Sequence, residues 1–103
     1  MTVNFAMEYL PKRMCELGYG NDYTIRLRHL LLQPLEVRTL NGYGQLFLLI
    51  EPAIDIRIES DTGFYDLSEY RTNEMQYEHQ GEIVITNLSI IRTHVIFIQV
   101  IPN

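Results

Sequence analysis

The feature that most constrains this chain is an alternation of apolar and polar residues, with a period of two, from Tyr23 onward. In the clearest case, three isoleucines alternate with three charged residues over positions 54–59. Successive side chains of a β-strand point to opposite faces of a sheet, so this pattern predicts a strand with one buried face. Similar runs recur to the end of the chain, separated by turn residues, and they predict about seven or eight short strands.

No repeating helical segments separate these runs, so the sequence predicts a mainly β fold. We expect an antiparallel β-sandwich or a jelly-roll-like barrel with a short N-terminal helix. All 103 residues fit one domain, with an arm and the short helix in 1–20 and the β-sandwich in 23–101.

Proline and glycine mark the expected element boundaries. Pro11 suits the first position of a helix and Gly18 the position after its end, which bounds about two helical turns. Residues 3–9 fit either an extended arm or a preceding helix, because Pro11 would end or kink a continuous one. Asn41-Gly42 is a strong hairpin signal, since both central residues of a type I′ turn need positive φ. Gln80-Gly81 is a second candidate for a tight turn.

Charge and cysteine content argue against several classes of protein. The formal net charge of −5 argues against general nucleic-acid binding, which relies on Lys and Arg at phosphates. The longest apolar run has the length of a strand and not the ~20 residues of a membrane span. The single cysteine, Cys15, cannot form an internal disulfide, which favours a cytosolic origin. The chain carries neither a glycine-rich phosphate loop nor a nucleophile elbow, and we expect no cofactor and no enzymatic activity.

The basic residues are almost all arginine. Of the eight, only Lys12 is lysine, and seven tyrosines accompany them. Tyr and Arg are enriched at protein interfaces and Lys is depleted there, because a planar guanidinium desolvates more readily than an ammonium. Genome base composition also replaces Lys by Arg. We interpret the pattern as a surface rich in interface residues.

The last strand is apolar on both faces. Ile96, Ile98 and Val100 lie on one face and Phe97 on the other. Leaving such side chains in water forgoes roughly 1.5–3 kcal/mol each. Either the N-terminal helix and arm cover this sheet, or a second copy of the chain does. We favour self-association into a closed cyclic oligomer and expect these four residues at the subunit interface.

The tripeptide Asp61-Thr62-Gly63 matches the active-site signature of aspartic proteases, in which two copies bring two carboxylates together. Apolar residues precede the tripeptide in those enzymes, whereas the polar pair Glu59-Ser60 precedes it here. A charged Glu59 would add repulsion between carboxylates. We therefore predict a turn in which Asp61 bonds to the following backbone and Gly63 takes positive φ.

Metal binding is a weaker alternative. Four carboxylates could gather around a calcium ion, although they lack the spacing of a known calcium loop: Glu59, Asp61, Asp66 and Glu69. The three histidines are not paired at metal-ligand spacing, and we expect hydrogen-bonded histidines within a sheet and no metal.

Three tyrosines fall close together in the sequence and offer a ligand platform. Tyr65, Tyr70 and Tyr77 are the candidates, and aromatic faces can stack on a sugar ring. Tyrosines of β-sandwiches more often pack with the ring buried. A carbohydrate- or ligand-binding β-sandwich module is therefore the alternative function.

Four phrases resemble small virion structural proteins of tailed bacteriophages, particularly those of Bacteroides-type hosts. They are Pro-Lys-Arg-Met-Cys-Glu-Leu-Gly-Tyr-Gly (11–20), Ser-Asp-Thr-Gly-Phe-Tyr-Asp-Leu (60–67), Gln-Tyr-Glu-His-Gln-Gly (76–81) and Phe-Ile-Gln-Val-Ile-Pro (97–102). The resemblance implies a head-fibre or capsid-decoration component that forms a homotrimer, contacts other virion proteins and is assembled in the host cytoplasm. The expected function is thus a non-enzymatic assembly protein.

Overall fold

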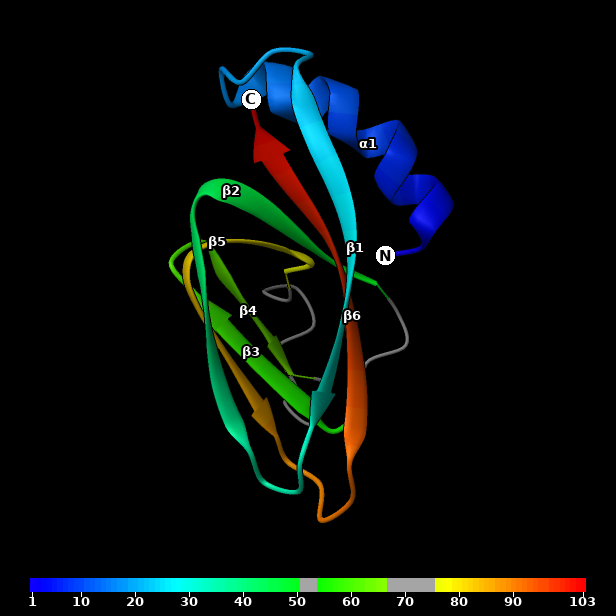
Figure 1. Cartoon of the computed structure of the whole chain (residues 1–103), viewed down its shortest axis with the longest axis vertical. Coiled ribbons are helices and arrows are strands. Elements are labelled where there is room, and N and C mark those ends of the chain that lie inside the picture. Colours follow the sequence, from blue (N-terminus) through cyan, green and yellow to red (C-terminus); the bar gives the residue numbers. More distant parts are fainter. Residues whose placement is uncertain (51–53, 67–75) are drawn as a thin grey trace.

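One helix precedes six strands in the computed structural model, which describes residues 1–50, 54–66 and 76–103 (Figure 1). The elements are α1 (Val3–Glu16), β1 (Tyr23–Leu32), β2 (Val37–Ile50), β3 (Ile56–Ser60), β4 (Gly63–Asp66), β5 (Glu78–Asn87) and β6 (Thr93–Pro102). The strands pair antiparallel in one sheet, in the order β1-β6-β2-β5-β3-β4. The predicted mainly β class with an N-terminal helix is confirmed. Of the part of the chain that is described, no helix is long and apolar enough to cross a membrane.

α1 is longer than the sequence predicted, because residues 3–9 are helical. The hydroxyl of Thr2 caps the helix by accepting a hydrogen bond from the Phe5 N–H at 3.1 Å. The expectation that Pro11 begins the helix is wrong, since it lies inside. Three buried residues before and after Pro11 pack against the sheet: Ala6, Leu10 and Met14. This packing offsets the hydrogen bond that proline cannot donate. Gly18 follows the helix with a φ of 82°, as expected of a residue beyond a helix end.

β2 is the longest strand, and it is shared between two neighbours. Residues 37–42 pair with β5, and residues 46–50 pair with β6 on the other side. After a register shift that follows Gly42, Phe47 and Leu48 also pair with β5. The tight turns predicted at Asn41-Gly42 and Gln80-Gly81 are therefore wrong, because both pairs lie inside strands. Gly42 is directly opposite Gly81, and a Cβ at Gly42 would lie 2.9 Å from the Gly81 carbonyl oxygen. The glycines thus permit a close approach of two strands and not a chain reversal.

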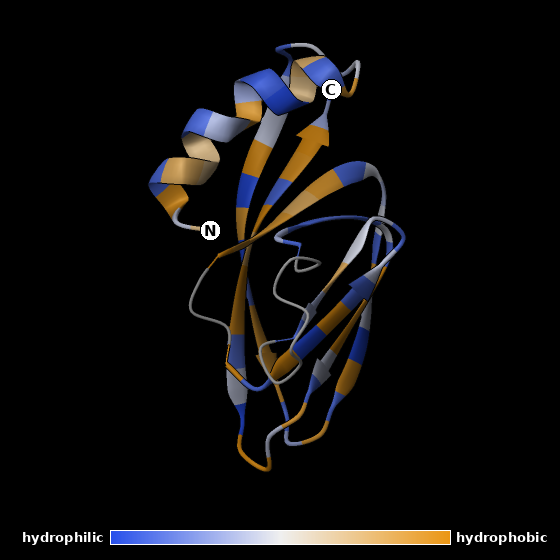
Figure 2. Ribbon diagram, turned by 180° about the vertical axis from the view of Figure 1, so that it is seen from behind, coloured by the Kyte–Doolittle hydropathy of each residue, from blue (hydrophilic) through white to orange (hydrophobic). Residues whose placement is uncertain are grey.

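The sheet is curled, and α1 lies against one end of it (Figures 1 and 2). Its two faces contribute to two separate apolar cores. The first core lies between the strands and contains Leu30, Leu32, Phe47, Leu49, Ile56, Ile58, Tyr65, Ile83, Ile85, Val95 and Phe97. The second lies between α1 and the opposite face of β2 and β6 and contains Ala6, Leu10, Met14, Leu46, Leu48, Ile50, Ile98 and Val100. The central strands are consequently buried on both faces.

The apolar faces of β6 are covered within one chain. Phe97 belongs to the first core, Ile98 and Val100 belong to the second, and Ile96 is half-buried against the second. The sequence allowed two ways of covering this strand, by the N-terminal helix and arm or by a second copy of the chain. In the structure the helix covers it. This burial removes the physical reason for assigning these residues to a subunit interface. Self-association itself stays a prediction.

A charged network holds α1 on the sheet at its β5 side. The Tyr9 hydroxyl donates to the Glu78 carboxylate at 2.6 Å, and the Arg13 guanidinium donates to both Glu78 oxygens at 2.8 Å. Burial and the hydrogen bond to Glu78 raise the pKa of Tyr9 to about 12. Burial opposes ionisation of Glu78, but the hydrogen bonds from Arg13 and Tyr9 outweigh it and lower the pKa of the carboxyl. The helix is therefore fixed by directed bonds as well as by apolar packing.

Candidate functional site

The Asp61-Thr62-Gly63 tripeptide forms the corner of the β3–β4 hairpin. Ser60 pairs with Gly63, so Asp61 and Thr62 are the two central residues of the turn. The predicted turn is confirmed, but Gly63 does not take the positive φ that we expected. Glycine is required there for space, because a Cβ would overlap the side chain of Gln76.

Side chains of the corner bind it to β5. The Thr62 hydroxyl accepts a hydrogen bond from the Gln80 N–H at 3.0 Å. The exposed Asp61 carboxylate lies against Gly81, whose φ is 74°. It also lies near the exposed Tyr43 and raises the pKa of that hydroxyl. An exposed carboxylate packed on a glycine differs from the paired setting in which two protease carboxylates share a proton. The geometry thus supports a turn former at Asp61.

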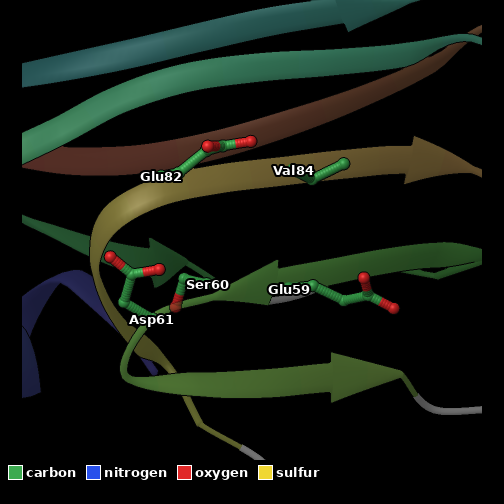
Figure 3. A pocket seen from close by; sticks show the side chains of 5 residues that line it. All are labelled: Glu59, Ser60, Asp61, Glu82 and Val84. Carbon is green, nitrogen blue, oxygen red and sulfur yellow. The ribbon is translucent and has the colours of Figure 1, made fainter.

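The same corner lines an open groove of about 300 Å³ on the sheet surface (Figure 3). The groove is lined by Glu59, Ser60, Asp61, Glu82 and Val84. In Figure 3 the Glu59 side chain points away from Asp61. The groove is acidic and shallow, and its carboxylates do not converge on one point.

The carboxylates that the sequence suggested for calcium are also not assembled into a site. Asp66 is buried and accepts a hydrogen bond from Arg57 at 2.9 Å, whereas Glu59 and Asp61 are exposed. Glu69 lies outside the described residues. Among positions 1–50, 54–66 and 76–103, no three His, Cys, Asp or Glu side chains are grouped so that they could hold a metal ion.

A hydrogen-bonded serine–histidine pair, to which no sequence pattern pointed, lies beside the corner. Ser60 Oγ is 2.7 Å from His79 Nδ1, and His79 Nε2 is 3.0 Å from the Gln76 carbonyl oxygen. A carbonyl only accepts, so Nε2 carries the proton and Nδ1 accepts from the Ser60 hydroxyl. Burial lowers the pKa of His79 to about 4, which makes the imidazole a weak base at neutral pH. The pair fits a structural link between β3 and β5 better than a nucleophile and its base.

Of the three tyrosines proposed as a ligand platform, the two that the structure describes are packed in or against the first core. Tyr65 is 1% exposed and belongs to the first core. Tyr77 packs on it with ring centroids 5.6 Å apart. Tyr70 lies outside the described residues. Burial of the Tyr65 ring in the core prevents it from stacking on a sugar.

A different surface is found at the end of the molecule away from α1, where the β1–β2 and β5–β6 loops come together (Figures 1 and 2). Leu35 is 62% exposed, Ile90 82% and Ile91 65%, and we call these three residues the apolar tip. The two loops are joined directly, since the Leu35 N–H donates to the Ser89 carbonyl at 3.1 Å. Clustered large apolar side chains in water are typical of contact surfaces.

Leu35 has a backbone conformation that leucine rarely adopts. Its turn is closed by the Glu36 N–H, which donates to the Gln33 carbonyl at 3.0 Å, and by the Gln33 N–H, which donates to the Glu36 carboxylate at 2.9 Å. Pro34 and Leu35 are the central residues, and Leu35 has a φ of 59°. Gly or Asn is usual at this turn position, and another residue there costs about 1–2 kcal/mol. Burial does not offset the cost, because the side chain is exposed.

The buried side chain of Asn87 holds both loops of the tip. Its amide nitrogen donates to the carbonyls of Gln33 at 3.0 Å and Ile91 at 2.8 Å, and its amide oxygen accepts from the Ser89 N–H at 3.0 Å. Its backbone N–H donates to the Glu36 carbonyl at 2.9 Å. The tip is consequently organised before any partner binds, which reduces the ordering cost of a contact.

Comparisons of the chain with protein-family models, with curated proteins and with solved structures found no match.

Proposed function

We propose that this chain is a non-enzymatic assembly protein that packs against other subunits with its apolar tip. The observation that carries the proposal is the exposed Leu35 at positive φ. A monomer would be served better by glycine at this position, since glycine adopts this φ freely and leaves no apolar side chain in water. A contact that buries the leucine explains why the chain carries it.

The neighbours of Leu35 support the same reading. Ile90 and Ile91 extend the apolar surface from the second loop, and the Asn87 side chain fixes the two loops relative to each other. A preorganised surface loses less conformational freedom when it binds, so more of the gain from apolar burial remains as affinity.

The resemblance to small virion proteins of tailed bacteriophages specifies the class of assembly. On that basis we propose a head-fibre or capsid-decoration component, a homotrimer as the oligomer, and other virion proteins as further partners. The genes beside the coding sequence test this part, because portal and capsid genes should flank it. Flanking genes of metabolic enzymes would contradict it.

Sedimentation velocity tests the role of the tip. We expect the wild-type mass to rise above that of two chains between about 1 and 100 µM, and we expect the double variant Ile90→Ser/Ile91→Ser to form assemblies of this size at least ~10-fold more weakly. Tyr43→Ser is a matched control, because Tyr43 is equally exposed, at 62%, but lies outside the tip. Equal association of the tip variant and the wild type would contradict the proposal, as would a wild type that remains a single chain.

A further inference from the structure

Burial changes abruptly across the sheet on the face that α1 covers. Ile25 is opposite Val100 and Leu27 is opposite Ile98 in the β1–β6 pair. Val100 and Ile98 are at most 1% exposed, whereas Ile25 is 40% and Leu27 is 56% exposed. α1 is bonded to Glu78 of β5, beyond β2 and away from β1. The apolar surface of the second core therefore continues onto β1, where the helix does not cover it.

β1 also has a free backbone edge. It is the first strand of the sheet, and among the described residues it pairs only with β6. The Asp22 carbonyl faces β6, because it accepts from the Asn103 N–H, whereas the Leu31 carbonyl faces the other side and accepts from Arg38. Backbone groups of successive residues point to opposite edges. Three residues in the upper part of β1 thus direct their N–H and C=O groups to the open edge: Tyr23, Ile25 and Leu27.

The opposite edge of the sheet is different. The Gln76 N–H donates to the Phe64 carbonyl of β4 at 2.7 Å, so part of that edge is already paired. Within the described residues, the edge of β1 therefore lacks a backbone partner along its upper part.

We propose that a second copy of this chain pairs antiparallel with β1 around a two-fold axis at Ile25. The inference rests on the proposed function as an assembly protein and names a second contact surface, distant from the apolar tip. A two-fold axis perpendicular to the sheet pairs side chains of the same face, and the residue on the axis lies opposite its own copy. The possible registers therefore differ in which residue of β1 lies on the axis. The axis at Ile25 places Arg28 opposite the partner's Asp22 and Arg26 opposite the partner's Thr24.

Other registers are less favourable in charge or length. An axis at Arg26 or at Arg28 places that arginine opposite its own copy, and an axis at Leu27 places Arg26 opposite Arg28. An axis at Thr24 shortens the paired segment. An axis at His29 requires the Leu31 carbonyl, which Arg38 already occupies.

The selected register is complementary on both faces. On the face of the second core, Ile25 meets the partner's Ile25 and Leu27 meets the partner's Tyr23. On the other face the acidic Asp22 meets Arg28. About six backbone hydrogen bonds form between the two edges. The row is self-complementary, which favours a second copy over an unrelated strand.

The first experiment blocks the edge in a protein whose tip has been changed. In the Ile90→Ser/Ile91→Ser background we expect a two-chain mass at micromolar concentration in sedimentation velocity. Ile25→Pro should reduce it to one chain, because proline removes an N–H that faces the open edge, where edge strands tolerate it. A charge exchange keeps the test valid if the proline variant does not fold. Arg28→Asp should weaken pairing, and Asp22→Arg together with Arg28→Asp should restore it.

The second experiment reads the register by cysteine cross-linking in a Cys15→Ser background. Ile25→Cys should form a disulfide between two chains under mild oxidation, because a cysteine on the axis faces its own copy at a distance that a disulfide spans. Leu27→Cys is the matched control and should remain reduced, since it faces the partner's Tyr23.

The outcomes separate the two proposals. A tip-changed protein that is monomeric and does not cross-link at position 25 overturns the β1 pairing and leaves the role of the tip to its own test. Preferential cross-linking at position 27 overturns the register. A two-chain mass that Ile25→Pro abolishes supports β1 pairing even if the tip variants associate like the wild type.

Discussion

The two ends of the molecule treat apolar side chains in opposite ways. At one end α1 covers the apolar face of β2 and β6, and Glu78 of β5 fixes the helix by accepting hydrogen bonds from Tyr9 and Arg13. At the other end Asn87 fixes two loops by a similar set of bonds, yet Leu35 and its neighbours remain in water. A half-buried carboxylate holds the helix over the core at the first end, and a buried amide holds the loops that display an apolar surface at the second. Changes to the polar side chains that fix each end should therefore affect stability, whereas changes to the exposed apolar side chains of the tip should affect association.

Acid should produce the largest effect, and it acts at the covered end. His79 follows Glu78 on β5, and burial lowers its pKa to about 4, compared with about 6.5 in an unfolded chain. Between these values the unfolded chain binds a proton that the folded chain does not. The free energy of unfolding should thus decrease as the pH falls below about 6.5 and lose roughly 3 kcal/mol by pH 4.

Urea unfolding at several pH values measures this loss. His79→Gln should remove the part of the pH dependence that lies above about pH 5, where carboxylates contribute little. His29→Gln is the control at an exposed histidine and should retain it. An unchanged pH profile in His79→Gln would show that His79 is not the group responsible.

Asn87→Ala should have the next largest effect and tests the displayed end. The carbonyls of Gln33 and Ile91 would lose the hydrogen bonds that the Asn87 amide donates, and the Ser89 N–H would lose its acceptor. We expect a loss of about 2–3 kcal/mol in the free energy of unfolding, measured in urea. Ser89→Ala removes only the hydroxyl that accepts from the Ile91 N–H and should cost less than about 0.5 kcal/mol. Equal losses in the two variants would mean that Asn87 does not organise the tip.

Glu78→Gln should have a smaller effect at the covered end. The neutral amide leaves the half-buried Arg13 without its bidentate carboxylate, and we expect a loss of about 1–2 kcal/mol. Glu16→Gln is the control, because Glu16 is the exposed partner of Arg13 at 3.3 Å and should matter by less than about 0.5 kcal/mol. If both variants lose the same amount, the anchoring role of Glu78 is not supported.

Leu35→Gly should have the smallest effect on stability, and its sign is the informative quantity. Glycine relieves the positive φ but adds freedom to the unfolded chain, so we expect no loss and a gain of up to about 1 kcal/mol. Association, measured by sedimentation, should weaken in the same variant. A clear loss of stability would show that the leucine serves the fold and not a contact.

The strands could be predicted from the sequence because side-chain alternation is local. The alternation over 54–59 corresponds to β3 together with the residues that precede it. Glycine signals failed where two of them interact, since Gly42 and Gly81 lie opposite each other across β2 and β5. The dipeptides Asn41-Gly42 and Gln80-Gly81 each predict a turn when they are considered alone. Only the pairing of β2 with β5 shows that their glycines permit a close approach of two strands.

The candidate sites were less accessible to sequence reasoning. The strained φ of Leu35 and the contacts of Asn87 depend on two loops that meet only in the folded chain. Ser60 and His79 likewise meet across the sheet. The only sequence sign of the tip was the presence of apolar residues at turn positions, which became informative once their exposure was known. That β1 lies at an edge of the sheet could likewise be recognised only once the order of the strands was known.

The position of β6 between β1 and β2 has a consequence for folding. During synthesis β1 and β2 are made before β6, which lies between them in the sheet. Their facing edges therefore remain unpaired until β6 is made, and β6 begins about 70 residues after the start of β1. Such long-range pairing slows folding and leaves apolar strands exposed in the meantime. Insertion of β6 should therefore be the rate-limiting event, and α1 can only settle on its final surface once that strand is in place.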